Sequence, residues 1–236
     1  MQISGLQKMT LLDFPGKVAC TVFLSGCNFR CPYCHNAELL DGRIEPLMSV
    51  EEFLSFLKKR VGLLDGVCVS GGEPTLHPGL KELLGQIKAM GYAVKLDTNG
   101  YRPDVLKAVI EEGLVDYVAM DIKNSPDAYG LTAGLSALNL EKIEESIRIL
   151  LEDNVDYEFR TTVVLPLHSE ATIADMAKWL HTICGSKKAK RLFLQPFVDR
   201  DTVPVAGLSA PDADQLTNFV NLLTSCAEEV ALRGVK

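Results

Sequence analysis

The sequence predicts an α/β fold in which a single domain forms an incomplete parallel (β/α)6 barrel. Short apolar runs alternate with stretches of helical periodicity, a pattern that favours a parallel sheet covered by helices. The chain has 236 residues, of which 47% are hydrophobic, enough for one sizeable core. About six strand–helix units are too few to close an eight-stranded barrel. We therefore expect one domain over residues 1–236, with residues 1–16 as an N-terminal lead segment.

The predicted strands are short apolar runs separated by turn signals. The first segment is a strand or hairpin that leads into a turn at residues 13–16. The run at 66–69 is continuously apolar, which is typical of a buried strand. The expected strands cover residues 2–13 (strand or hairpin), 18–24, 66–69, 93–96, 115–120, 157–165 and 191–195.

The predicted helices begin at recognisable N-terminal signals. Residues 49–52 form a capping box, and Pro78 suits the first position of a helix that ends near Gly91. The segment 140–151 is clearly amphipathic, with apolar residues at helical spacing on one face. The expected helices cover residues 49–60, 78–91, 103–112, 140–151, 170–183 and 209–229.

Composition excludes several classes of partner. The formal net charge is −7 and no long basic run occurs, so nucleic-acid binding is disfavoured; the basic cluster at 187–191 is expected to be a solvated turn. No stretch approaches the 18 or more apolar residues of a membrane span, and residues 1–5 do not start a secretion signal. Seven cysteines without such a signal indicate a reducing compartment. We expect a cytoplasmic protein.

Three cysteines, Cys27, Cys31 and Cys34, lie in the loop that follows the strand 18–24, with the spacing C-x3-C-x2-C. Three thiolates on a short loop can each bind one iron of a 4Fe-4S cluster, which leaves the fourth iron open to a small molecule. A Cys3His zinc site that includes His35 is the alternative, although ligands adjacent in the chain fit one tetrahedron poorly. A structural disulfide is disfavoured in a reducing compartment.

The other four cysteines are isolated in the sequence, and we interpret them as small buried apolar residues rather than as ligands of a second cluster. They are Cys20, Cys68, Cys184 and Cys226.

Polar and glycine residues follow the other predicted strands at the ends where parallel barrels gather their functional residues. Gly71-Gly72-Glu73 is a tight turn, or a place where backbone closely approaches a ligand. Asp97-Thr98-Asn99-Gly100 forms an Asx turn or contributes to a site.

Two more charged positions lie further along the chain. Asp121 and Lys123 fall on the same side of a strand. Arg160 lies on an otherwise apolar strand and is expected to have a partner, because an unpaired buried charge is costly.

The cysteine loop, with the aromatic Tyr33 directly before its last cysteine, resembles the signature of the radical S-adenosylmethionine enzymes. The resemblance implies that Cys27, Cys31 and Cys34 ligate a 4Fe-4S cluster and that the open iron chelates the methionine part of S-adenosylmethionine. In such enzymes an electron from the reduced cluster cleaves the cofactor to a 5′-deoxyadenosyl radical, and the protein supplies orientation. No side chain is then needed as a general acid or base.

The same resemblance assigns roles to the strand ends. Gly71, Gly72 and Glu73 resemble the motif that holds the methionine amino group. The remaining positions resemble those of activating enzymes for glycyl-radical proteins, in which such residues surround the methionine end of the cofactor and the two aspartates can help to hold a monovalent cation. These positions are Asp97, Thr98, Asp121 and Lys123.

Two further contacts with the cofactor are implied less directly. Arg160 either reaches the ribose or the carboxylate of the cofactor or forms a structural salt bridge. Tyr33 is expected to stack near the cluster, with its backbone at the adenine edge.

The lead segment 5–17 and residues 34–39 are similar to the start of the activating proteins of anaerobic ribonucleoside-triphosphate reductase. The resemblance implies that the protein makes a glycyl radical on such a partner, that a flavodoxin- or ferredoxin-type protein donates the electron, and that the loop 123–134 shapes the entrance for the partner. Two alternatives remain: a radical enzyme acting on a small molecule, as deazapurine synthases do, and a non-catalytic metal or electron-transfer protein.

Overall fold

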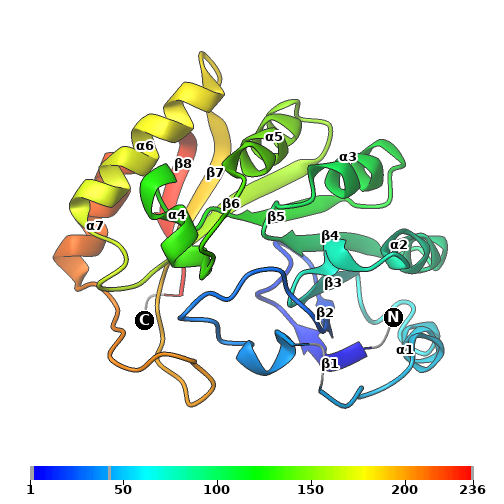
Figure 1. Ribbon diagram of the computed structural model, residues 1–236. Helices are drawn as coiled ribbons and strands as arrows, with labels where there is room; N and C mark the ends of the chain where they lie inside the picture. The colour runs from blue at the N-terminus through cyan, green and yellow to red at the C-terminus, as the bar shows by residue number, and fades with distance from the viewer. Residues whose placement is uncertain (1–2, 42–43, 235–236) are drawn as a thin grey trace. The chain divides into compact units, whose positions relative to one another are not determined.

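The computed structural model describes residues 3–41 and 44–234, and its strands pair in chain order, β1-β2-β3-β4-β5-β6-β7-β8 (Figure 1). This order is linear, so the sheet formed by the described residues is not closed. The expected α/β class and the unclosed parallel sheet are therefore confirmed. No described helix combines the length and the apolar character that crossing a bilayer requires.

The chain divides into two compact units. The first unit comprises Met1–Asn28, Glu38–Ala119 and Asn154–Asp156, and the second comprises Phe29–Ala37, Met120–Asp153 and Tyr157–Lys236. The boundary at residues 28 and 29 falls inside the cysteine loop. The expectation of a single domain stays a prediction.

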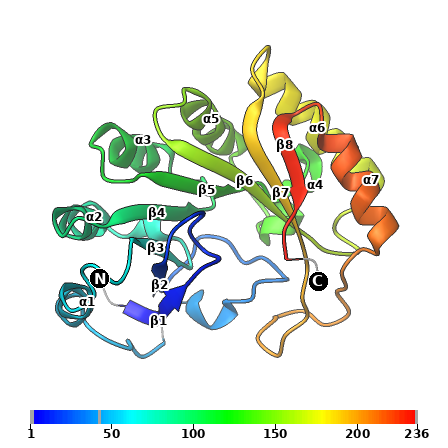
Figure 2. The same cartoon turned by 180° about the vertical axis from the view of Figure 1, so that it is seen from behind.

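In the first unit, the carboxyl ends of three neighbouring strands lie at the same end of the sheet. β2, β3 and β4 are parallel, with Leu24 opposite Gly71 and Val69 opposite Leu96, so their carboxyl ends lie together. Figure 2 shows β1 beside β2, with which it pairs in the antiparallel direction. The elements of this unit are β1 (Ile3–Thr10), β2 (Ala19–Leu24), α1 (Val50–Lys58), β3 (Gly66–Gly71), α2 (Leu80–Ala89), β4 (Ala93–Thr98) and α3 (Pro103–Glu111).

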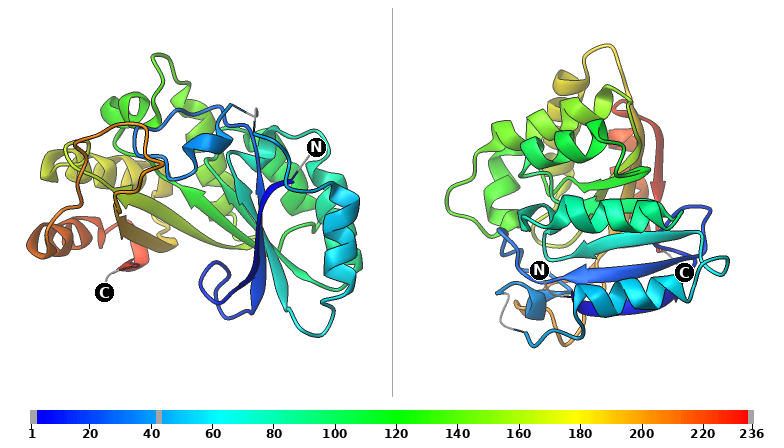
Figure 3. Two further views of the ribbon diagram at one scale, coloured as in Figure 1. Left: turned by 90° about the horizontal axis from the view of Figure 1, so that it is seen from below. Right: turned by 90° about the vertical axis from the view of Figure 1, so that its right-hand side faces the viewer.

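Helices α1 and α2 of the first unit lie side by side against its strands (Figure 3). The predicted capping box begins α1: Glu52 N–H donates to Ser49 Oγ (3.1 Å), and Ser49 N–H donates to Glu52 Oε2 (2.8 Å). α1 buries Phe53 and Leu57, which recur at helical spacing. The start of α1 and its buried face therefore follow from signals that are local in the sequence.

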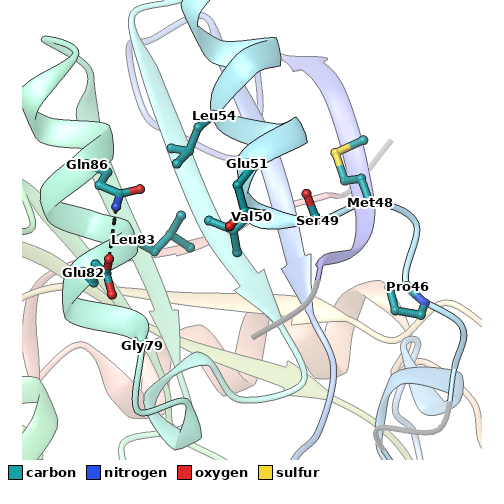
Figure 4. A pocket seen from close by; sticks show the side chains of 10 residues that line it. All are labelled: Pro46, Met48, Ser49, Val50, Glu51, Leu54, Gly79, Glu82, Leu83 and Gln86. Atoms are coloured by element: carbon teal, nitrogen blue, oxygen red, sulfur yellow. Dashed lines mark hydrogen bonds between the residues drawn. The ribbon is translucent and has the colours of Figure 1, made fainter.

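A pocket of about 580 Å³ opens between α1 and α2 (Figure 4). Met48, Leu54 and Leu83 contribute apolar side chains to it, and Gln86 donates a hydrogen bond of 3.3 Å to Glu82 at its edge. None of the residues that line this pocket is among the cofactor residues predicted from the sequence.

After its short segment Phe29–Ala37, the second unit resumes at Met120, within β5 (Tyr117–Asp121). Its strands β6, β7 and β8 are parallel, and helices α6 and α7 contact each other. Its further elements are α4 (Pro126–Ala133), α5 (Leu140–Leu151), β6 (Asp156–Val163), α6 (Glu170–Cys184), β7 (Ala189–Pro196), α7 (Ala213–Leu223) and β8 (Ala227–Leu232).

Two expectations for the second unit are wrong. The final helix predicted at 209–229 is shorter, because α7 ends at Leu223 and the chain continues as β8, which pairs with β7. The segment 123–134 is not a loop: Pro126 occupies the first turn of α4, and Gly134 ends it in the left-handed conformation. The first error arises because an apolar run this short fits a helix and a strand about equally well. The second arises because α4 lacks an apolar stripe at helical spacing and contains Pro126 and Gly130, which are typical of turns.

The added strand β8 brings Arg233 onto the buried Glu158 of β6. Arg233 donates to both carboxylate oxygens (2.6 and 2.9 Å), and its guanidinium lies 3.8 Å from the centroid of the Phe193 ring. The Glu158 side chain is fully buried. An Arg233→Ala variant should therefore lose about 3 kcal/mol of unfolding free energy, because it leaves a buried carboxylate without its cation.

Urea denaturation followed by circular dichroism measures this loss. The matched control is Lys178→Ala, which removes the cation of an exposed pair with Asp175 (2.9 Å) and should change the unfolding free energy by less than about 0.5 kcal/mol. Equal effects of the two substitutions would contradict the assignment of Arg233 as a structural anchor.

Candidate cofactor site

In the first unit, the Gly-Gly turn after β3 packs directly on the start of the cysteine loop. Gly72 N–H donates to Leu24 O, and Glu73 N–H donates to Gly26 O, each at 2.8 Å. A Cβ on Gly71 would lie 2.2 Å from Leu24 O, and one on Gly72 would lie 2.1 Å from Gly26 O. The glycines thus permit a close approach of two backbone segments of the chain itself, and their contact with the cofactor stays a prediction.

Two residues without a role predicted from sequence hold the first part of the cysteine loop. Asn99 Nδ2 donates to Asn28 Oδ1 (2.9 Å) and lies 4.0 Å from the Sγ atom of Cys27. His77 Nε2 lies 2.8 Å from Ser25 O. Asn28 Nδ2 is buried, and no hydrogen-bond partner for it occurs among the described residues. The Asx-turn signal at Asn99 was visible in the sequence, whereas the contact of His77 was not.

Glu73 points into the first unit. Its side chain is 1% exposed, and its oxygens accept hydrogen bonds from Thr75 N–H (3.1 Å), Thr75 Oγ1 (2.5 Å), Thr98 Oγ1 (2.8 Å) and Asn99 N–H (2.7 Å). Burial raises the pKa of this carboxyl, and the hydrogen bonds oppose the rise only in part. Glu73 and Thr98 therefore join the turn after β3 to the end of β4, and their contacts with the cofactor stay predictions.

Asp97, at the end of β4, has a cationic partner that the sequence analysis missed. The ammonium of Lys95 forms an ion pair with Asp97 Oδ1, and Ser70 Oγ donates to Asp97 Oδ2 at 3.0 Å. Lys95 is 1% exposed, and its ammonium lies 3.8 Å from Cys68 Sγ. A lysine within an apolar strand was the available signal, of the same kind as the one that drew attention to Arg160.

In the second unit, Asp121 accepts from two cationic side chains. Lys123 Nζ lies 2.9 Å from Asp121 Oδ2, and Arg160 contacts Asp121 Oδ1 through Nε (3.1 Å) and a terminal nitrogen (3.0 Å). The expectation that Arg160 has a charged partner is confirmed. Burial disfavours the charged form of Lys123, but the surrounding groups, chiefly Asp121, outweigh it and hold its pKa well above the usual value.

Lys123 also acts on the second part of the cysteine loop. Burial raises the pKa of the Cys31 and Cys34 thiols, and the Lys123 ammonium opposes the rise at both. Tyr33 lies between them in the chain; its hydroxyl is buried without a hydrogen-bond partner among the described residues, and burial raises its pKa. The net effect still favours the protonated thiols, and the Lys123 ammonium makes the thiolate form that binds iron less costly than burial alone would.

The cysteine loop is further anchored within the second unit. Arg30 N–H donates to Ala133 O (2.8 Å) at the end of α4, and a Cβ on Gly134 would lie 1.9 Å from Arg30 O. His35 Nε2 lies 2.7 Å from Val198 O. Sequence reasoning missed Gly134, because nothing local to it reveals a contact more than 100 residues away in the chain.

His168, to which the sequence analysis assigned no role, supports Lys123. Its ring is buried; Nδ1 accepts from Val164 N–H (3.1 Å), so that Nε2 donates to Lys123 O (2.8 Å). Burial lowers the pKa of this histidine, which favours the neutral form that the two hydrogen bonds require.

The donor set fits an iron–sulfur cluster in its chemistry. Cys27, Cys31 and Cys34 take no part in a disulfide bond. Within the described part of the chain, no three His, Cys, Asp or Glu side chains converge as ligands of one metal ion. Assignment of the cysteines to a cluster therefore rests on their spacing and on the family of the chain.

A sequence model of the Radical SAM superfamily matches residues 21–180, more than half of the chain. The chain belongs to this superfamily. Members bind a 4Fe-4S cluster and S-adenosylmethionine. Three cysteines outside disulfide bonds, on a loop in which Asn28 Nδ2 and the Tyr33 hydroxyl are buried without a described partner, fit these groups in their chemistry. The resemblance inferred from the cysteine loop is confirmed.

Individual relatives show which members of the superfamily this chain is similar to. A Methanocaldococcus jannaschii protein that carries the name of a glycyl-radical enzyme activating enzyme is 37% identical over 99% of this chain and 96% of its own. A 7-carboxy-7-deazaguanine synthase of Methanopyrus kandleri is 31% identical over 47% of this chain and 51% of its own. A domain of the pyruvate-formate lyase-activating enzyme of Bacteroides vulgatus superposes with a TM-score of 0.57 at 21% identity, over 72% of this chain and 99% of its own. The structural likeness shows the fold.

Proposed function

We propose that this protein is a glycyl-radical enzyme activating enzyme and that its partner is an anaerobic ribonucleoside-triphosphate reductase. The observation that carries the proposal is the match to a relative of that name along 99% of this chain. The lead segment 5–17 supports the choice of partner, because it is similar to the start of activating proteins of that reductase. The single domain and the cytoplasmic location expected from the sequence belong to the same proposal.

When bound, a reduced 4Fe-4S cluster and S-adenosylmethionine would supply one-electron reductive cleavage of the cofactor, with methionine as the second product, and hydrogen-atom abstraction from the partner glycine. Cys27, Cys31 and Cys34 would hold three irons, and the Lys123 ammonium would offset part of the cost of holding Cys31 and Cys34 as thiolates. A flavodoxin- or ferredoxin-type protein supplies the electron. Proton transfer by a side chain is not required.

The other residues orient the cofactor. The turn after β3 holds the methionine amino group, and the charged groups after β4 and β5 support its carboxylate. Arg160 and Tyr33 complete the site, Arg160 through its ion pair with Asp121 and Tyr33 through its place beside the cluster ligands. The proposed cofactor residues are Tyr33, Gly71, Gly72, Glu73, Asp97, Thr98, Asp121, Lys123 and Arg160.

The test is an anaerobic assay of the full chain. The protein is loaded with iron and sulfide, reduced with dithionite and mixed with S-adenosylmethionine, with and without the reductase; 5′-deoxyadenosine is quantified and the glycyl radical is sought by electron paramagnetic resonance. A radical doublet on the reductase is expected. Formation of deoxyadenosine without a radical doublet would show that this reductase is not the partner. Absence of both products from cluster-loaded protein would refute cofactor cleavage.

A small-molecule substrate is the second candidate, since a deazaguanine synthase is among the relatives. That relative matches about half of the chain, whereas the activating-enzyme relative matches nearly all of it. Formation of a deazapurine from its small-molecule substrate, with no glycyl-radical protein present, would favour this candidate over the first.

Helix α4 offers a contact for the partner, because Leu131 on it is 69% exposed. Leu131→Asp should leave deoxyadenosine formation within about twofold of wild type and lower the glycyl-radical yield roughly tenfold at limiting protein, since a charge on a docking surface weakens binding by about 1.4 kcal/mol. Leu63→Asp, at a similarly exposed leucine outside α4, is the control. Equal radical yields from the two variants would exclude α4 from the partner surface.

A further inference from the structure

Lys95 of β4 is a buried cation whose place in the fold the proposed function does not explain. The residue is 1% exposed and lies on a strand whose other side chains are largely apolar. A buried ammonium is tolerated only when it is paired, and here its partner is the carboxylate of Asp97. The pair is therefore a permanent part of the first unit, at a residue assigned to the cofactor.

The surroundings of Asp97 do not suit a free monovalent cation. Oδ1 carries the Lys95 ammonium, and Oδ2 accepts from Ser70 Oγ at 3.0 Å. A metal cation at this carboxylate would lie close to a positive charge in a largely buried environment. Like charges about 4 Å apart repel by roughly 4 kcal/mol at the effective dielectric constant of a protein.

The other aspartate that the resemblance assigned to such a cation, Asp121, also has cationic partners of its own. In the second unit, Asp121 pairs with both Lys123 and Arg160. Asp97 thus has one cationic side chain from its own unit, and Asp121 has two. The monovalent cation expected from the resemblance does not fit the residues of this chain.

We propose that the Lys95 ammonium takes the place of a free monovalent cation at Asp97, so that cofactor binding by this protein does not depend on potassium or sodium. The inference rests on the proposed function in one respect, namely that Asp97 serves the cofactor. Lys95 is a positioning residue: it neutralises and orients Asp97 and does not itself contact the reacting atoms. Because it is tethered, this cation is present at any salt composition.

The first experiment needs no activity. Thermal unfolding of cluster-free protein is followed in potassium, sodium, ammonium and tetramethylammonium chloride at equal ionic strength. Wild-type midpoints should agree within about 1 °C in all four salts. Lys95→Met keeps much of the side-chain volume but frees a site at Asp97, so potassium, sodium or ammonium should raise its midpoint by at least about 3 °C over tetramethylammonium, because a ligand that binds only the folded state stabilises it.

The matched control is Lys88→Met, which removes the cation of the more exposed pair with Asp116 (2.6 Å) and should show no preference among the four salts. Lys95→Arg retains the charge and should also be insensitive. If Lys95→Met does not fold, the salt series of wild type and of Lys95→Arg still test the proposal. An unfolding midpoint that potassium or sodium raises specifically in either protein overturns it. A folded Lys95→Met without any cation preference overturns it as well.

The second experiment uses the loaded enzyme. Deoxyadenosine formation by wild type should vary less than about twofold among the four salts, while Lys95→Met should be slow in tetramethylammonium and recover at least about fivefold in potassium or ammonium. A fivefold activation of wild type by potassium overturns the proposal. If wild type cleaves no cofactor in any salt, the proposed function fails, and the thermal series still tests the cation separately.

Discussion

Replacement of any one of Cys27, Cys31 and Cys34 by alanine is expected to reduce deoxyadenosine formation to background. Each thiolate is proposed to hold one iron, and a loop with two ligands leaves a second iron open, so the cluster is lost or no longer binds the cofactor in a single way. Iron and sulfide content after anaerobic loading, together with deoxyadenosine measured in one turnover, reports both effects.

The control for this prediction is the set of cysteines outside the loop. Cys184→Ala removes a buried thiol at the end of α6, and Cys226→Ala removes one at the residue before β8. Both variants should load iron and cleave the cofactor like wild type. Wild-type activity in any of the three loop variants, or loss of iron in either control, would refute the assignment of the cluster to the loop.

Gly134→Ala is expected to have the second largest effect. Gly134 has a φ of +68°, and an added Cβ would lie 1.9 Å from Arg30 O, well inside van der Waals contact. The backbone of Arg30 must then move, and Cys31 follows it in the chain. We expect at least a tenfold loss of loaded cluster and of deoxyadenosine formation, which corresponds to about 1.4 kcal/mol or more.

The matched control separates the clash from backbone strain. Gly113 has nearly the same φ, +65°, but open space where its Cβ would be. Gly113→Ala should lose only about 1 kcal/mol of stability from the left-handed conformation and should keep its cluster. Equal cluster loss in both variants would show that strain alone explains the result, and normal loading of Gly134→Ala would show that α4 does not position the cysteine loop.

Several features could be predicted because they are local in the chain. Strands and helices alternate with readable periodicity, and the capping box at Ser49 begins α1 as expected. The cysteine spacing is complete within eight residues, so no tertiary information was needed to recognise it. The need of Arg160 for a partner followed from the cost of burying a lone charge on an apolar strand.

Other features were not predictable because they depend on partners distant in the chain. The end of α7 and the strand β8 are decided by pairing with β7, which a short apolar run does not reveal. The inward direction of Glu73 follows from donors on Thr98 and Asn99, two residues of the next strand end. The requirement for glycine at 134 comes from the carbonyl of Arg30.

The sequence by itself determined the α/β class, the family and the chemistry of the cysteine loop, because periodicity and ligand spacing are properties of neighbouring residues. Only the tertiary structure showed which charged side chains are paired with an opposite charge inside the protein. Lys95 and Asp97 lie two residues apart, on the same side of β4, yet their pairing in a buried position depends on the strands and helices that exclude water from them. Burial changes the strength of every charge interaction, and burial is a property of the whole fold.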